Sequence, residues 1–167
     1  MEIIYREATP ADAQALLDYL KTVGGESDNL TFGAEGLPVT AEQEEVFLSG
    51  MQNNPNFLML SAFDGDEIVG NASISRLPRA RFAHRWEIAI SVRKSHWGCG
   101  IGSNLLNRLI EFAKNNGAEV ISLEVRSDNE RAKALYHKFG FEQFGTYRKF
   151  FKINGEYFDA DYMNLYL

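Results

Sequence analysis

In some segments of the chain apolar residues alternate with polar ones, and in others they recur every three to four positions, which predicts strands and helices respectively. The clearest strand covers residues 85–92, where Trp86 and Ile88 alternate with Glu87 and Ala89 and therefore face opposite sides of a sheet. The other predicted strands cover residues 3–8, 57–63, 67–76 and 120–125, followed by two long strands on either side of Asn154-Gly155.

Four helices are predicted between these strands, and capping residues give their ends. Thr40 with Gln43 is a capping box, and proline in the first turn after Thr9 is a further start signal. The first expected helix begins at Thr9-Pro10 and ends at Gly24-Gly25, and the second begins at Thr40 and ends near Met51. The third follows a glycine-rich turn and ends at Asn116-Gly117, and the fourth extends from Asn129 to Phe139 before Gly140. Residues 26–39 are expected to form a loop.

The order of these elements, β-α-α-β-β-β-α-β-α-β-β, predicts the fold class. Residues 85–125 form a strand–helix–strand crossover, which requires parallel strands, whereas the turns at Asp64-Gly65 and Asn154-Gly155 are hairpins and require antiparallel ones. We therefore expect an α/β (mixed α+β) protein with a mixed, mostly antiparallel sheet flanked by helices. No repeat or linker interrupts the chain, so residues 1–167 are predicted to be a single domain.

Composition narrows the class of protein further. With 17 Lys and Arg against 23 Asp and Glu, the net charge is −6, so the chain has no general attraction for nucleic acid or for an anionic membrane. No signal peptide or membrane-spanning run is visible at or after the N-terminus. The single cysteine, Cys99, cannot form an internal disulfide, which favours a reducing compartment. We expect a soluble, cytoplasmic protein.

The most informative segment is the glycine-rich turn between the strand 85–92 and the next helix. Alternate glycines allow backbone N–H groups to approach an anion at a helix N-terminus, so the turn is a candidate phosphate site. A P-loop is excluded because no lysine follows Gly102, and Ser103 stands where a dinucleotide fingerprint has its third glycine. Glu124 lies at a suitable distance for a ribose-binding acid, so the dinucleotide alternative stays open beside the pyrophosphate of an acyl-CoA and a turn that binds nothing.

Three segments together resemble the GNAT superfamily of N-acetyltransferases, over essentially the whole chain. They are Arg6-x-Ala8-x-x-x-Asp12, the loop from Val92 to Leu106 with Gly98-x-Gly100-Ile101-Gly102, and Leu123-x-Val125…Asn129-x-x-Ala132-x-x-Leu135-Tyr136-x-x-x-Gly140-Phe141. The resemblance implies a GNAT-like acyl-CoA N-acyltransferase fold with acetyl-CoA as acyl donor and no metal. One departure is visible, since Trp97 occupies a position that is often Gln or Arg in the family.

The resemblance also implies a set of cofactor-binding residues. The backbone of Ile90 and Val92 is expected to contact the pantetheine arm like an added strand, and Asn129 to help bind the cofactor. The pyrophosphate would lie against the turn formed by Trp97, Gly98, Cys99, Gly100, Ile101, Gly102 and Ser103. Tyr136, which is seven residues after Asn129 and so on the same helix face, would contact the cofactor and protonate the departing thiolate. The alternative is that Asn129 is a helix cap and Tyr136 a core aromatic.

Amine acetylation needs a base, because an amine with a pKa near 10.4 is only about one part in two thousand neutral at pH 7. Glu87 is the predicted base, directly or through water, since it lies on the strand that leads into the glycine-rich turn, beside the small residues Ala89 and Ser91. The alternative is a solvent-facing glutamate. An acetyl-cysteine at Cys99 is disfavoured because no histidine–carboxylate partner is evident.

The remaining candidates are charged clusters and histidines. The three histidines have no ligand-like spacing, so no metal site is expected; they are His84, His96 and His137. An acidic set in the loop between the first two helices either attracts a cationic amine or is simply solvated; it comprises Glu26, Asp28 and Glu35. Arginines at the far end of the strand 85–92 are expected on the surface, namely Arg76, Arg79, Arg81 and Arg85.

These residues predict an N-acetyltransferase that moves an acetyl group from acetyl-CoA to a primary amine by direct transfer in a ternary complex. The acceptor is a small molecule or a protein N-terminus or lysine, and the sequence does not choose between them. Two alternatives are a non-catalytic acyl-CoA-binding sensor on the same fold and a dinucleotide-binding domain. The long C-terminal strands could pair across a homodimer, an expectation that rests on fold-level analogy.

Overall fold

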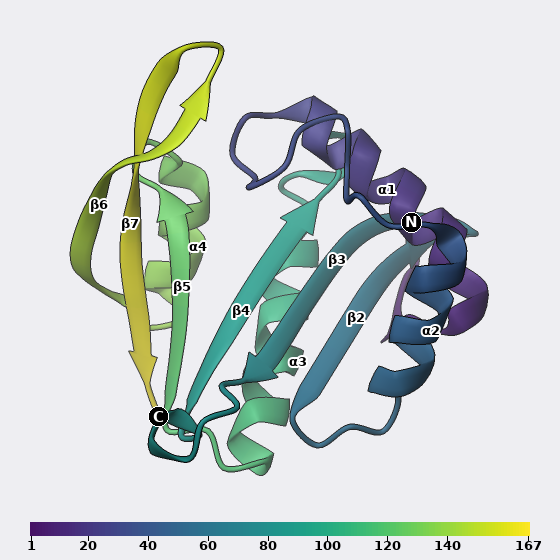
Figure 1. The fold of residues 1–167 in the computed structure, drawn as a ribbon, viewed down its shortest axis with the longest axis horizontal. Coiled ribbons are helices and arrows are strands. Elements are labelled where there is room, and N and C mark those ends of the chain that lie inside the picture. The colour runs from purple at the N-terminus through teal and green to yellow at the C-terminus, as the bar shows by residue number, and fades with distance from the viewer.

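The computed structural model of the protein describes residues 1–167, which form a seven-stranded sheet with helices on both faces (Figure 1). The strands are β1 (Ile3–Glu7), β2 (Phe57–Asp64), β3 (Glu67–Arg76), β4 (Arg85–Val92), β5 (Val120–Arg126), β6 (Glu142–Ile153) and β7 (Glu156–Tyr166). The helices are α1 (Ala13–Glu26), α2 (Ala41–Met51), α3 (Ile101–Asn115) and α4 (Glu130–Lys138). None of the four helices combines the length and apolar character needed to cross a membrane.

The sheet has the order β1-β2-β3-β4-β5-β7-β6, and β4 with β5 is its one parallel pair. This arrangement confirms the predicted mixed, mostly antiparallel sheet and the parallel crossover through α3. Helices α1 and α2 cover one face, and α3 and α4 cover the other (Figure 1).

The strands β4 and β5 are paired at one end only. Their ladder joins residues 85–87 to residues 120–122, after which β4 stays bonded to β3, and β5 to β7. The sheet therefore opens between its two halves, as the diverging arrows in Figure 1 show. Backbone groups of residues 88–92 that face β5 are left without a strand partner, and unpaired N–H and C=O groups are a template for an extended ligand.

The main core lies between the sheet and the helices α3 and α4. Leu105, Leu106 and Leu109 of α3 are fully buried there, as their helical spacing predicts. The first turn of α3 packs closely on β3, because a Cβ added at Gly70 would lie only 2.8 Å from Cγ2 of Ile101. This close packing fixes the N-terminus of α3 against the sheet.

A smaller core lies under α1 and α2, and here one sequence prediction is wrong. Gly24-Gly25 does not end the first helix, since α1 continues to Glu26. A Cβ at Gly24 would lie 2.0 Å from the carbonyl oxygen of Gly33, so the glycine permits the loop after α1 to fold back onto the helix. The helix ends instead where Ser27 becomes extended.

The other expected elements agree with the structure to within a few residues, and Trp86 is buried whereas Glu87 on the opposite face of β4 is exposed. Arg76 is exposed, as expected, and its guanidinium donates to the carbonyl of Ala83. The edge strand β6 exposes Phe144 and Tyr147. Dimerisation through the C-terminal strands stays a prediction.

Candidate active site

A cavity of about 1100 Å³ fills the opening in the sheet and continues under α1 and α2. Its lining includes the glycine-rich turn, the inner end of β4, residues of β5 and α4, and side chains of both helices on the opposite face. The volume is slightly above the usual range of about 300–1,000 Å³ for small-molecule sites, so it leaves room for two ligands side by side.

The glycine-rich turn closes one end of the cavity. Gly98 and Gly100 have φ angles of +76° and +80°, a region that costs any residue with a Cβ about 1–2 kcal/mol. Gly100 is the N-cap of α3, and no side chain caps this helix. The amides of the first turn of α3 are therefore open to a ligand, which is the arrangement that binds a phosphate.

Trp97 connects the two halves of the sheet at this end. Its indole Nε1–H donates to the carbonyl of Val92 at 2.9 Å, and the guanidinium of Arg131 from α4 lies 4.2 Å from its ring centroid. The side chain thus spans from the end of β4 to the start of α4, across the opening. The indole N–H is therefore already used within the protein.

Two carboxylates lie where β4 and β5 separate. Glu87 pairs in register with Ser122 of β5, and Glu124 follows two residues later on β5. Partial burial, with the negative charge of Glu87 adding to it, raises the pKa of Glu124 above its ordinary value. Glu124 lines the cavity and Glu87 does not, so the structure adds a second acid beside the predicted base.

Tyr136 lines the cavity from α4 and is 7% exposed, with its ring 5.7 Å from that of Phe141. Burial raises the pKa of its phenol well above the usual value, so the hydroxyl stays protonated at neutral pH. Asn129 also lines the cavity and caps α4, its side-chain oxygen accepting from the amide of Ala132 at 3.2 Å. Asn129 is therefore a helix cap and Tyr136 a core aromatic, as the alternative stated, and a role with the cofactor stays a prediction for both residues.

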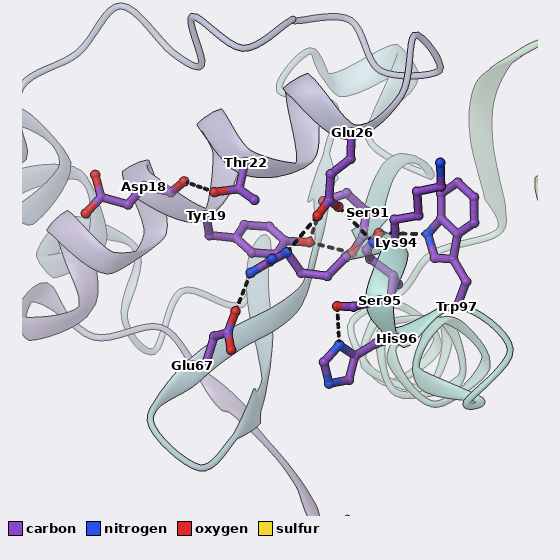
Figure 2. Close-up of polar contacts among 12 residues, drawn as sticks. Asp18, Tyr19, Thr22, Glu26, Glu67, Ser91, Lys94, Ser95, His96 and Trp97 are labelled. Atoms are coloured by element: carbon purple, nitrogen blue, oxygen red, sulfur yellow. Dashed lines mark hydrogen bonds and ion pairs between the residues drawn. The ribbon is translucent and has the colours of Figure 1, made fainter.

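A polar network ties the end of α1 to the end of β4, opposite the opening (Figure 2). Tyr19 donates its hydroxyl proton to the carbonyl of Ser91, 2.9 Å away. The carboxylate of Glu26 accepts from Nε of Arg93 at 3.0 Å and from the amide of Lys94 at 2.8 Å, while Arg93 also pairs with Glu67. Glu26 therefore links α1 to the end of β4, and its carboxylate is already paired with Arg93.

The other members of the acidic loop also have local roles. Glu35 accepts from the amide of Gly33, which lowers its pKa, and the backbone carbonyl of Asp28 accepts from Arg126. The carboxylates of Glu26 and Glu35 are therefore already bonded within the protein, whereas Asp28 is exposed.

His96 lies between Ser95 Oγ, 2.8 Å from its Nδ1, and Asp64, 3.1 Å from its Nε2. No group of three or more metal-binding side chains occurs in the structure. The sulfur of Cys99 is exposed and contacts only the carbonyl of Trp97, at 3.8 Å. No histidine or carboxylate forms a hydrogen bond with Cys99 that would make it a base-assisted nucleophile.

Comparison with known proteins gives a consistent result. The acetyltransferase (GNAT) family matches residues 26–141. The N-alpha-acetyltransferase RimI of Mycobacterium tuberculosis is 38% identical over 103 residues, which cover 61% of this chain and 63% of that protein, so the chain matches less than two thirds of this relative. The L-amino acid N-acetyltransferase AaaT of Escherichia coli is 32% identical over 76% of this chain and 79% of its own length.

A solved structure of a GNAT-family acetyltransferase from Streptococcus pneumoniae is similar over the whole fold. It superposes with a TM-score of 0.95 at 32% identity, covering 99% of this chain and 100% of that one. The similarity includes the residues on both sides of the opening between β4 and β5.

Proposed function

The chain belongs to the acetyltransferase (GNAT) family, and on this basis we propose that it transfers the acetyl group of acetyl-CoA to a primary amine. The observation that carries the proposal is the open sheet between β4 and β5, with phosphate-binding amides at one end and two carboxylates at the other. We also propose that residues 1–167 act as one domain, which is supported by the single sheet that all seven strands form.

Acetyl-CoA enters the opening from the side of the glycine-rich turn. The pyrophosphate contacts the open amides at the start of α3, and the pantetheine arm extends along β4. The amide groups of the arm pair with backbone groups of Ile90 and Val92, which have no partner on the β5 side. Asn129 and the residues of the turn complete the pocket around the cofactor.

The acceptor amine approaches from the side of α1 and α2. Its nitrogen attacks the thioester carbonyl, the C–S bond breaks, and CoA leaves as a thiolate. The Glu87–Glu124 pair takes the proton of the amine, directly or through water, and Glu124 is the member that faces the cavity. Tyr136 supplies a proton to the thiolate, a role that its position in the cavity wall supports.

Thermal unfolding with acetyl-CoA, NAD or ATP tests the cofactor. At about a hundred times its Kd, the true ligand adds roughly 2.7 kcal/mol to the free energy of unfolding, a shift of a few degrees. We expect acetyl-CoA and CoA to stabilise the protein and NAD not to do so. Stabilisation by NAD instead would support the dinucleotide alternative.

Acceptor-dependent release of CoA tests the reaction itself. We expect a thiol reagent to detect free CoA only when acetyl-CoA and an amine are both present, and the signal to fall in Glu124→Gln. A protein that binds acetyl-CoA but releases no CoA with any amine would be the non-catalytic sensor.

A further inference from the structure

Glu44 is a buried carboxylate without a partner. It lies in the first turn of α2, is 7% exposed, and lines the cavity. The capping box of α2 uses Thr40 and Gln43, and no hydrogen bond or ion pair of the protein involves the Glu44 side chain. Burial alone raises its pKa. The Glu44 oxygens are not among the fully buried side-chain atoms, so they are open to the cavity, where a cation could pair with them.

Apolar side chains line much of the cavity that Glu44 faces. Phe47 of the same helix packs edge-on against Phe57 of β2, with ring centroids 5.7 Å apart, and Leu16 of α1 and Met59 of β2 line the same cavity. An alkyl chain fits such a wall, whereas a hydrated anion does not. Glu44 on α2 and Glu124 on β5 are carboxylates that line this cavity.

The basic side chains of the cavity are already paired. Arg126 donates to both carboxylate oxygens of Asp128, at 2.6 and 3.0 Å, and lies over the ring of Phe158. Arg131 is stacked on Trp97. Arg126 is therefore already paired and Arg131 lies at the Trp97 end of the cavity, whereas Glu44 and Glu124 would each receive a cation.

We propose, on the basis of the function above, that the acceptor is an aliphatic diamine whose second ammonium group pairs with Glu44 while the first is acetylated beside Glu124. The alkyl chain between the nitrogen atoms lies against the apolar wall. Glu124 belongs to β5 and the Phe47–Phe57 contact holds α2 against β2, so β3, β4 and the opening lie between the two carboxylates. Several methylene groups must therefore separate the two nitrogen atoms.

The test compares acceptors in the CoA-release assay. The kcat/KM of each 1,n-diamine, from three to eight carbons, is divided by that of the n-alkylamine of equal length, and L-amino acids are assayed beside them. Charge-assisted pairing predicts a ratio of about ten to a hundred at the best length and poor turnover of amino acids. Efficient turnover of L-amino acids, or a ratio near one at every length, overturns the proposal.

Two variants assign the preference to Glu44. Glu44→Gln keeps the shape of the side chain and should bring the ratio close to one, mainly by raising the KM for the diamine. Glu45→Gln makes the same change of charge at the exposed neighbouring position and should keep the wild-type ratio. A preference that survives in Glu44→Gln overturns the assignment.

A binding measurement separates this inference from the proposed function. With CoA present, the best diamine should raise the melting temperature of the wild type and of Glu45→Gln but not of Glu44→Gln. Absence of CoA release with every amine contradicts the proposed function itself, and the inference with it. Release with monoamines and diamines alike contradicts the inference alone.

Discussion

The two ends of the cavity are built by different means. At the donor end, backbone groups form the binding site: two glycines with positive φ, uncapped helix amides and the unpaired edge of β4. At the acceptor end, side chains from α2, β2, β4 and β5 form the binding site, and Glu44 and Glu124 are among them. A backbone site suits a ligand that is the same in every member of a family, whereas a side-chain site can change its acceptor through a few substitutions.

The largest expected effect is on the acceptor side, at the carboxylate pair. Replacing Glu124 with Gln removes a proton acceptor at the cavity wall, and we expect kcat to fall by about 10²–10³-fold while acetyl-CoA binding is retained. Initial rates and thermal shifts measure the two quantities separately. If this variant also lost acetyl-CoA binding, the donor and acceptor ends would not be separate binding sites, and the comparison would be wrong.

The pH profile of the reaction tests whether Glu87 and Glu124 act together. Burial and the charge of Glu87 both raise the pKa of Glu124, so activity should rise with pH along a limb that lies above the ordinary glutamate range. Glu87→Gln removes one of these causes and should move that limb to lower pH. A limb that stays in place in Glu87→Gln would show that the pair does not act together.

Tyr136→Phe tests the leaving group, between the two ends. A thiol with a pKa near 8.5 is already a tolerable leaving group, so we expect a loss of about 10²-fold in kcat at most. The ring stays buried against Phe141, so the variant should fold. An unchanged kcat would show that Tyr136 does not protonate the thiolate and has only a structural role.

A smaller effect is expected on the donor side, from Gly100→Ala. A Cβ there meets no atom within 4 Å, so the only cost is the φ of +80°, about 1–2 kcal/mol. We expect acetyl-CoA to bind roughly ten times more weakly, as measured by titration, because the turn relaxes away from its geometry. Gly50→Ala on α2 also meets no atom and has no positive φ, so it should leave acetyl-CoA binding at the wild-type level.

The smallest expected effect is a loss of stability at the ion pair between Arg6 of β1 and Asp12, the residue before α1. Arg6 donates to both oxygens of Asp12, at 2.7 and 2.9 Å, and lowers the pKa of this carboxyl from 3.8 to about 2. A lowered pKa stabilises the fold above the unfolded value, so about 1–2 kcal/mol should be lost as the pH falls from about 4 to 2. Asp12→Asn should lose this already at pH 7, as measured by denaturant unfolding.

The sequence predicted the donor end far better than the acceptor end. The glycine-rich turn and the Asn129 cap are local patterns, and local backbone rules decide their conformation. The continuation of α1 through Gly24 depends on the distant Gly33, which packs against it. Glu44 looks like an ordinary exposed residue of a polar helix, and only the packing of α2 on the sheet shows that it is buried. Glu124 lines the cavity because β4 and β5 separate after three residue pairs, and no pattern in the sequence predicts that separation.

The central claim is that donor and acceptor meet in one cavity and react directly. Initial rates with acetyl-CoA and amine varied together test it most directly. Direct transfer requires both substrates to be bound at once, so double-reciprocal plots at different acetyl-CoA concentrations should intersect. Parallel lines would mean that CoA leaves before the amine binds, as an acetyl-enzyme requires, and would contradict the account.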